Sequence, residues 1–181
     1  MLRFMEIRSG DELAFRQVYN EVFPVVMKVA YHVTYNQDVA EDICQDAFIR
    51  FYDKDMSFPS MDDAKFWLIR VVKNLSINHV KRKMRESASL EKVMRGPQSN
   101  PFKDGASELI LKESTAAVRK AVSELPEIYK TVIVLREYAG LNYKEIAGVL
   151  KISESNVKVR VHRARKELEA RLDREEVNVP R

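Results

Sequence analysis

Residues 141–168, LNYKEIAGVLKISESNVKVRVHRARKEL, have the pattern of two helices separated by a tight turn. Asn142 can cap the first helix, and Glu145 three residues later completes a capping box. Residues 151–153 form the turn, in which the Ser153 side chain can accept from the first N–H groups of the second helix. Apolar residues recur at helical spacing and predict the buried stripe of the second helix: Val157, Val161, Ala164 and Leu168.

The opposite side of this second helix is basic. It carries Ser155, Lys158, Val159, His162, Arg163 and Lys166. A short capped helix that supports a helix with a basic outer face is typical of proteins that read the DNA major groove. The alternative is a solvated helical hairpin whose charges face only water. The cap, the small Ala147, the turn and the basic face occur together, which favours DNA.

Composition indicates a soluble all-α protein. The chain has 181 residues, enough for one ordinary domain or two small ones, with 45% hydrophobic and 32% charged residues. Only 5 Gly and 6 Pro argue against an all-β fold, and a net charge of +4 matters less than where the charges lie. The single Cys excludes an internal disulfide and a Cys-based zinc site. The N-terminus has no apolar signal core and no stretch is long enough to span a membrane, so we expect a cytoplasmic protein without membrane insertion.

Residues 8–86 are expected to form the first of two helical domains. Residues 11–35 are apolar at helical spacing, and Pro24 predicts either two helices or one with a start or kink there. Asn36, Gln37 and Asp38 predict a turn in which Asp38 and Glu41 make a capping box. The next helix is expected to bury Ala40, Ile43, Cys44, Ala47 and Phe51, and to expose Glu41, Asp42, Gln45, Asp46, Ile49 and Arg50.

After a predicted loop over residues 53–63, a long helix is expected over residues 64–85, with Leu68, Val71, Val72 and Leu75 buried. Its other side carries an aromatic residue, two amides and cations at spacings of three and four: Trp67, Arg70, Asn74, Asn78, Lys81 and Arg85. Such a face can hold unpaired nucleotides, because bases stack on rings and cations follow phosphates. Alternatively, Trp67 is a core residue and the basic end is a solvated helix terminus. We favour the core for Trp67 alone, and nucleic acid for the whole face.

Residues 87–107 have scattered Gly and Pro and weak periodicity, which predicts a flexible linker. Residues 108–174 then form the second domain, with helices over about 108–124 and from Pro126 to Gly140, followed by the helix-turn-helix. No set of residues suggests catalysis. His32, His79 and His162 are not spaced as a metal site, and the paired acids from Glu41 to Asp46 have no nearby base. We therefore expect no enzyme activity, metal or cofactor.

Three stretches together resemble the extracytoplasmic-function (ECF) sigma factors, a two-domain class of bacterial transcription initiation factors. They are DVAEDICQDAFIRFY, FWLIRVVKNLSINHVKRK and LPEIYKTVIVLREYAGLNYKEIAGVLKISESNVKVRVHRARKEL, in matching order and spacing over nearly the whole chain. The sequence departs from the family at Lys151, where Gly is usual. A non-Gly residue with positive φ there costs on the order of 1 kcal/mol.

The resemblance implies three binding surfaces and no catalytic residues. The exposed face of the helix near residue 45 would dock on the polymerase β′ coiled coil: Glu41, Asp42, Gln45, Asp46, Ile49 and Arg50. The promoter −10 element would be captured and held open by Phe58, Trp67, Arg70, Asn74, Asn78, Lys81, Arg82 and Arg85. The −35 element would be read by the helix-turn-helix, with Lys158, Val159, His162 and Arg163 nearest the bases, Arg160 and Arg165 at the edge, and Ser155 and Lys166 beside them.

The partners implied by the resemblance are core RNA polymerase, through its β′ coiled coil and β flap, promoter DNA and an anti-sigma factor. The alternative function is a helix-turn-helix regulator that does not replace a sigma factor. The lack of a ligand-pocket signature and the basic helix over residues 64–85 favour the sigma factor. The sequence leaves open whether the two domains pack together.

Overall fold

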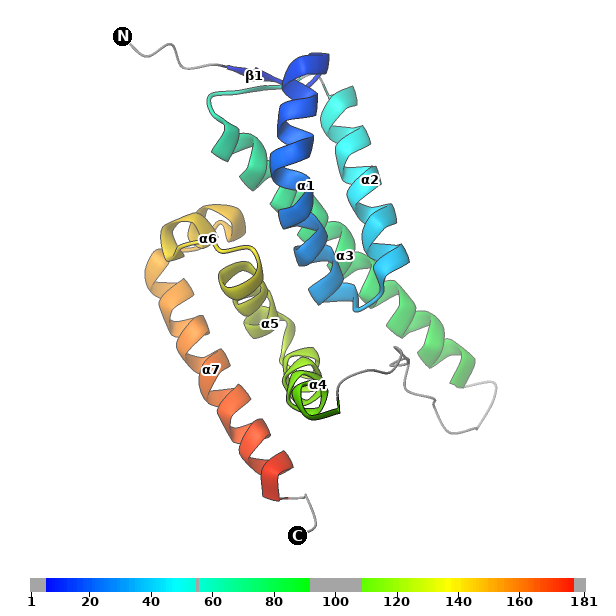
Figure 1. Cartoon of the computed structure of the whole chain (residues 1–181), viewed down its shortest axis with the longest axis vertical. Helices are drawn as coiled ribbons and strands as arrows, with labels where there is room; N and C mark the ends of the chain where they lie inside the picture. The colour runs from blue at the N-terminus through cyan, green and yellow to red at the C-terminus, as the bar shows by residue number, and fades with distance from the viewer. Residues whose placement is uncertain (1–5, 55, 92–108, 178–181) are drawn as a thin grey trace.

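The computed structural model describes residues 6–54, 56–91 and 109–177, which are helical almost throughout (Figure 1). The all-α class and the helix-turn-helix in the second half are confirmed. The elements in chain order are β1 (Ile7–Arg8), α1 (Glu12–Thr34), α2 (Gln37–Asp53), β2 (Ser57–Phe58), α3 (Met61–Glu91), α4 (Leu109–Ser123), α5 (Glu127–Ile133), the π-helical turn η1 (Val134–Tyr138), α6 (Tyr143–Leu150) and α7 (Glu154–Val177).

Helix α1 runs unbroken through Pro24. Asp11 caps it, since its carboxylate accepts from the Ala14 N–H at 2.8 Å. A proline inside a helix costs about 3 kcal/mol because it removes a backbone hydrogen bond. Full burial of an aliphatic side chain stabilises the fold by roughly 1.5–3 kcal/mol. Four valines on one side of this helix are 0% exposed: Val18, Val22, Val26 and Val29. Packing therefore keeps α1 in one piece.

Helix α2 begins two residues earlier than a cap at Asp38 would require. Asn36 is the N-cap, and its side chain accepts from the Val39 N–H at 2.9 Å. The predicted capping box of Asp38 and Glu41 is therefore wrong. Glu41 instead accepts from the Gln37 side-chain amide at 3.0 Å. The predicted inward face is confirmed, because each of its members is at most 7% exposed: Ala40, Ile43, Cys44, Ala47 and Phe51.

The predicted loop over residues 53–63 contains a strand. Strand β2 pairs antiparallel with β1, with Ile7 opposite Phe58. Ser9 extends the pairing, because its backbone N–H donates to the Met56 carbonyl at 2.9 Å and its hydroxyl accepts from the Met56 N–H at 2.8 Å. The prediction of an unbroken loop is thus wrong, since two-residue strands held by long-range pairing leave no periodic signal.

Helix α3 is longer than predicted at both ends. It starts at Met61, where the Ser60 hydroxyl accepts from the Asp63 N–H at 3.2 Å, and it continues to Glu91. The helix thus runs past residue 87, where the predicted linker begins, and residues 92–107 of that linker lie outside the described ranges. Of the predicted stripe, Leu68 and Val72 are 0% exposed while Val71 and Leu75 are half-buried. Ile69, also 0% exposed, was not predicted.

In the second half, Pro126 precedes α5 and Gly140 follows η1 at φ 71°, as their sequence positions predict. The π turn closes with the Ala139 N–H donating to the Val134 carbonyl at 3.1 Å. Arg136 then fixes the chain that enters α6, since its guanidinium donates to the Leu141 carbonyl at 2.9 Å. These contacts set where the helix-turn-helix starts.

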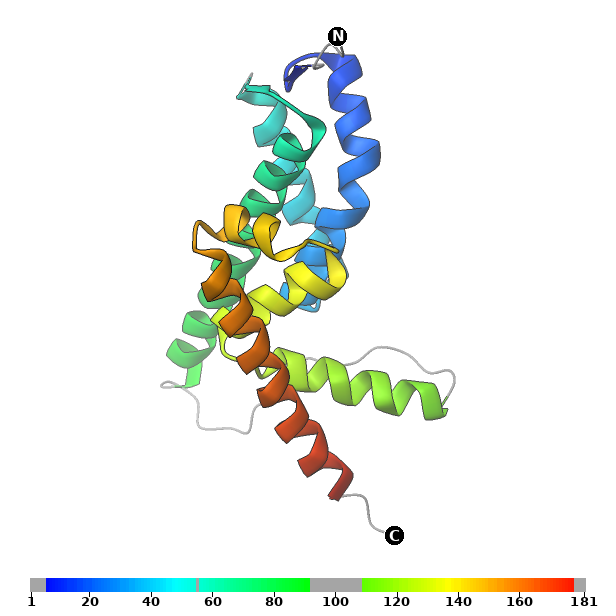
Figure 2. The ribbon, with the colours of Figure 1, turned by 90° about the vertical axis from the view of Figure 1, so that its left-hand side faces the viewer.

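The two halves pack against each other, and their buried residues form one continuous cluster. Figure 2 shows α6 against the middle of α3, while the later turns of α7 extend away from the first three helices. Helix η1 contacts α1. Helices α2 and α7 lie on opposite sides of the molecule (Figure 1). Within the described residues, no helix is both long enough and apolar enough to cross a membrane.

Candidate nucleic-acid and partner surfaces

Helices α6 and α7 form the predicted helix-turn-helix. The capping box is present, with the Asn142 side chain accepting from the Glu145 N–H at 3.0 Å and the Glu145 carboxylate accepting from the Asn142 N–H at 2.7 Å. Lys151 adopts the left-handed conformation at φ 55° and ψ 47°. The Ser153 hydroxyl accepts from the Asn156 N–H at 3.2 Å and so starts α7. Local hydrogen bonds thus fix where each of the two helices begins.

Helix α7 separates a buried stripe from a charged outer face. Val157, Val161 and Ala164 are at most 2% exposed, and Leu168 is half-buried. All six residues predicted for the outer face are exposed: Ser155, Lys158, Val159, His162, Arg163 and Lys166. Lys158 forms an ion pair with Glu154 at 3.0 Å, both in the first turns of the helix. This exposed pair is weak and does not prevent Lys158 from binding a phosphate.

The two arginines predicted at the edge of this face have local partners. Arg160 is half-buried and donates to the Asn156 side chain at 2.9 Å. Arg165 pairs with Glu137 of η1 at 3.0 Å. Both lie beside the outermost residues of α7, so their cations suit contacts to phosphates more than to base edges.

Helix α3 exposes most of its predicted nucleic-acid face. Five members are exposed: Asn74, Asn78, Lys81, Arg82 and Arg85. The two aromatic members are packed inward. Phe58 is 5% exposed, and half-buried Trp67 packs its ring 5.8 Å from Phe51 and 6.1 Å from Phe58. Trp67 therefore has the core role that we favoured for it alone, and Phe58 presents little ring surface to a base.

The second half of the chain covers part of this α3 face. The Arg70 guanidinium donates to the carbonyls of Gly148 and Val149, at 2.8 and 3.1 Å, near the C-terminal end of α6. A cation there also interacts favourably with the helix dipole. Lys81 pairs with Glu127 of α5 at 2.9 Å. In this arrangement the second half of the chain binds two cations that the sequence analysis assigns to DNA, Arg70 and Lys81.

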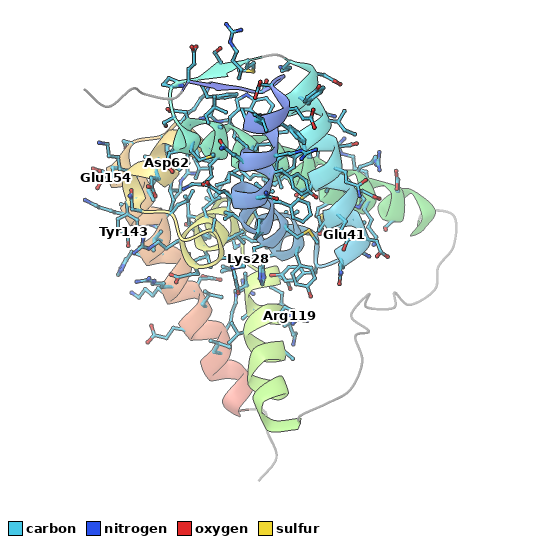
Figure 3. The ribbon with its side chains drawn as sticks, turned by 45° about the horizontal axis from the view of Figure 1, so that its top comes forward. Lys28, Glu41, Asp62, Arg119, Tyr143 and Glu154 are labelled. Atoms are coloured by element: carbon cyan, nitrogen blue, oxygen red, sulfur yellow. The ribbon has the colours of Figure 1, made fainter. Side chains whose placement is uncertain are left out.

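A ring stack completes the contact between the halves. The rings of His32 on α1 and Tyr138 on η1 lie 3.4 Å apart at 18°. Burial, together with the nearby cations Arg119 and Lys28, lowers the His32 pKa from 6.5 to about 4. Figure 3 labels both cations, which come from α4 and α1. His32 is thus a packing residue, as the sequence indicated.

The predicted outer face of α2 is exposed except at Glu41, and it carries charges around one apolar side chain. Asp42, Gln45, Asp46 and Arg50 are exposed, Glu41 is half-buried, and Ile49 is 58% exposed. Figure 3 shows Glu41 on one side of the view and Glu154, the first residue of α7, on the other. The α2 face and the start of α7 are therefore accessible to two different partners.

An aromatic strip that the sequence analysis missed adjoins this face. Tyr52 of α2, 47% exposed, lies edge-on to Phe15 of α1 with ring centroids 5.4 Å apart. Phe15 stacks on Tyr19, which stacks on Phe23 at 4.9 Å. The four-residue spacing of these α1 rings is a signal for one helix face. That they border α2 depends on the packing of the two helices.

The described residues hold no group of His, Cys, Asp or Glu side chains that could bind a metal ion. Cys44 is buried on the inner face of α2, where burial and the nearby Glu41 carboxylate together raise the pKa of its thiol to about 12. A thiol with so high a pKa is a poor nucleophile. Cys44 therefore packs the core, as predicted.

Two family models match this chain. Residues 18–86 match Sigma-70 region 2, and residues 115–168 match Sigma-70, region 4. The ECF RNA polymerase sigma factor SigW of Bacillus subtilis is 30% identical over 178 residues, which cover 94% of this chain and 95% of the relative. This chain belongs to the ECF sigma factors. A second relative, SigM of the same organism, is 30% identical over 132 residues, covering 72% of this chain and 77% of SigM.

Solved structures share the fold of this ECF sigma factor. The sigma factor RpoE of Bartonella quintana, in complex with the anti-sigma factor NepR, superposes with a TM-score of 0.65 at 23% identity, covering 88% of this chain and 96% of that one. CnrH, in complex with the cytosolic domain of CnrY, gives a TM-score of 0.63 at 23% identity, covering 91% of each chain. The two matching family models and the Bacillus subtilis relative SigW show that the protein is an alternative sigma factor of transcription initiation, and its family consists of transcription factors rather than enzymes.

Proposed function

We propose that this sigma factor reads the −35 element with the outer face of α7, holds the melted −10 element on α3 and docks on core RNA polymerase through α2. The domains would be residues 8–86 and 108–174. The basic face of α7, supported by the capped α6, carries this proposal. Lys158, Val159, His162 and Arg163 would lie nearest the bases, with Arg160 and Arg165 on phosphates and Ser155 and Lys166 beside them.

On α3 the exposed amides and cations support a role in holding single-stranded DNA. Asn74 and Asn78 can bond the exposed edges of unpaired bases, while Lys81, Arg82 and Arg85 follow the backbone phosphates. Phe58 and Trp67 support this face from beneath, since both pack on Phe51. Extrusion of a base costs a few kcal/mol, so the protein must offset that cost with a pocket.

The α2 face would dock on the polymerase β′ coiled coil through Glu41, Asp42, Gln45, Asp46, Ile49 and Arg50, and the second domain would contact the β flap. An exposed isoleucine surrounded by charges supports this role, because apolar contacts there would be ringed by polar ones. We further infer that an anti-sigma factor binds this protein in the cytoplasm, as NepR binds RpoE in the solved complex.

Run-off transcription with purified core polymerase and a pool of genomic promoter fragments tests the function. Discrete transcripts that require this protein are expected, and their aligned upstream sequences define both promoter elements. Specific DNA binding without polymerase, and no new transcripts, would favour a conventional regulator instead.

Variants separate DNA reading from polymerase binding. Lys158→Ala or Arg163→Ala should lower −35-dependent initiation about five- to a hundredfold, since one lost base or phosphate contact costs roughly 1–3 kcal/mol. Core binding should be unchanged, and Arg8→Ala, which removes an exposed cation of β1, is the control. Equal loss of initiation and core binding would contradict the assignment of α7.

A further inference from the structure

Val159 occupies the outermost position of α7. The buried residues Val157, Val161 and Ala164 define the inner side of the helix, and at 100° per residue Val159 falls directly opposite them. Its side chain is 46% exposed. Over residues 154–172 of α7, the part whose side chains the structure describes, it is the one large hydrophobic residue with such exposure. The outward face of this helix thus has an apolar centre.

The surroundings of Val159 give it no structural role. Its neighbours one turn away are the exposed Ser155, His162 and Arg163, so it packs on no apolar side chain of its own face. Valine is also a poorer helix former than alanine, lysine or arginine, because its branched side chain loses rotamer freedom in a helix. A single exposed apolar residue is common on protein surfaces. Here, however, it stands at the centre of a face that otherwise carries only polar and charged side chains.

The DNA major groove offers one apolar group to such a side chain. Hydrogen-bond donors and acceptors line the base edges, and the C5-methyl of thymine is the exception. The early residues of a recognition helix lie nearest the base edges, and Val159 is the sixth residue of α7. We propose that Val159 contacts a thymine methyl in the −35 element and selects an A·T pair at that position. This inference rests on the proposed function and names the base chemistry that α7 recognises.

The expected size of the effect is small but measurable. Burying one methyl group is worth about 0.8 kcal/mol, which corresponds to about a fourfold change in affinity. Hydrogen bonds from Lys158 or Arg163 cannot report this difference, because thymine and uracil present the same donors and acceptors. Replacing thymine by deoxyuridine therefore removes only the group that Val159 would touch.

The test uses the full-length protein with core polymerase on a promoter found by run-off transcription. Each thymine of the −35 element, on both strands, is replaced singly by deoxyuridine, and formation of the initiation complex is measured. With the wild-type protein, deoxyuridine at one of these positions should lower formation of the initiation complex about three- to fivefold. On the unmodified promoter, Val159→Ala should form the initiation complex less well than the wild-type protein by a similar factor. Deoxyuridine at that position should then cause this variant no further loss.

Matched variants keep the experiment interpretable. Val118→Ala removes the same two methyl groups from a valine of α4 that is 41% exposed. With this control variant, deoxyuridine should still cause the full wild-type loss of complex formation, which we call the uracil penalty. Val159→Thr retains one methyl and should keep part of that penalty. The inference is overturned if no single uracil matters, or if Val159→Ala retains the wild-type penalty. A protein that directs no transcription would instead overturn the proposed function, and this inference with it.

Discussion

At the scale of single residues, two helices end in a conformation that L side chains rarely adopt. Tyr35 has φ 52° after α1, and Lys151 has φ 55° after α6. Only glycine enters this left-handed region without a steric cost. Lys151 adopts this conformation at a position where the family resemblance leads one to expect glycine. Its backbone N–H still donates to the Ala147 carbonyl. The turn geometry is therefore retained at some expense of stability.

Lys151→Gly should raise the free energy of unfolding by about 0.5–1 kcal/mol, because the strain at positive φ exceeds the entropy that glycine adds to the unfolded chain. Urea denaturation measures the change. Lys166→Gly is the control, since the same substitution at an exposed position inside α7 should lower stability by about 1 kcal/mol. Destabilisation by both variants would show that Lys151 is not strained.

At the scale of elements, α2 divides its two faces between the core and a partner. Its inner face is fully packed against α1 and α3, so substitutions there disturb folding. Its outer face carries exposed acids around Ile49, so substitutions there test binding without disturbing the core. The two effects can be separated experimentally because they fall on opposite sides of one helix.

Asp42→Lys and Asp46→Lys should weaken core polymerase binding about five- to a hundredfold, because reversing one member of a charge pair costs roughly 1–3 kcal/mol. Surface plasmon resonance with immobilised core enzyme measures the affinity. Glu21→Lys makes the same charge change at an exposed site of α1 and should bind normally. A complex that survives both α2 reversals would place the docking face elsewhere.

At the scale of the whole molecule, the contact between the two halves competes with a proposed function. Arg70 is bonded to the end of α6, so it can reach promoter DNA only after the second domain has moved. The contact also includes the Lys81–Glu127 pair and the His32–Tyr138 stack. These contacts lie beside the buried apolar cluster that both halves share, and exposed ion pairs add little. Substitution of Arg70 should therefore shift the balance between closed and open forms while leaving that cluster in place.

Arg70→Ala should increase the open population, because it removes both hydrogen bonds to α6. Spin labels on cysteines introduced at the exposed Asp53 and Glu169 would report the distance between the halves, with the buried Cys44 replaced. Arg82→Ala is the matched control on α3, since the Arg82 ion pair with Glu86 stays within that helix. Identical distance distributions for all three proteins would show that Arg70 does not hold the halves together.

Acid should also open the contact. Separation exposes His32 and returns its pKa from about 4 toward 6.5, so between these values the open form binds more protons. The closed form is then favoured fully above pH 6.5 and progressively less as pH falls toward 4. Besides the cations Lys28 and Arg119, three tyrosine rings lie near His32: Tyr31, Tyr35 and Tyr138. Burial raises the pKa of Tyr35 and Tyr138, so neither of them ionises in this range.

The same spin labels measure this pH dependence. His32→Phe keeps an aromatic ring against Tyr138 but cannot be protonated, so its distance distribution should change less between pH 6.5 and pH 5. An equal response of wild type and His32→Phe would assign the pH dependence to other groups.

Local sequence patterns were sufficient to predict most helices and the exposed faces of α2 and α7. The Asn142–Glu145 box, the turn at Lys151 and the stripe from Val157 to Ala164 depend on residues within two helical turns of each other, so the sequence predicts them directly. The errors have local causes too. Asn and Asp are about equally good N-cap residues, so the local sequence does not decide whether Asn36 or Asp38 caps α2.

The sequence by itself determined which sides of α2 and α7 are buried and which surfaces of α2, α3 and α7 carry charge, because helical periodicity is a property of neighbouring residues. Four features depend on residues that are far apart in the sequence, and only the tertiary structure decided them. They are the β1–β2 pairing, the burial of Phe58, the aromatic strip between α1 and α2, and the contact of Arg70 with α6. Arg70 and the α6 carbonyls are 78 and 79 residues apart, and no local pattern encodes a bond across that separation.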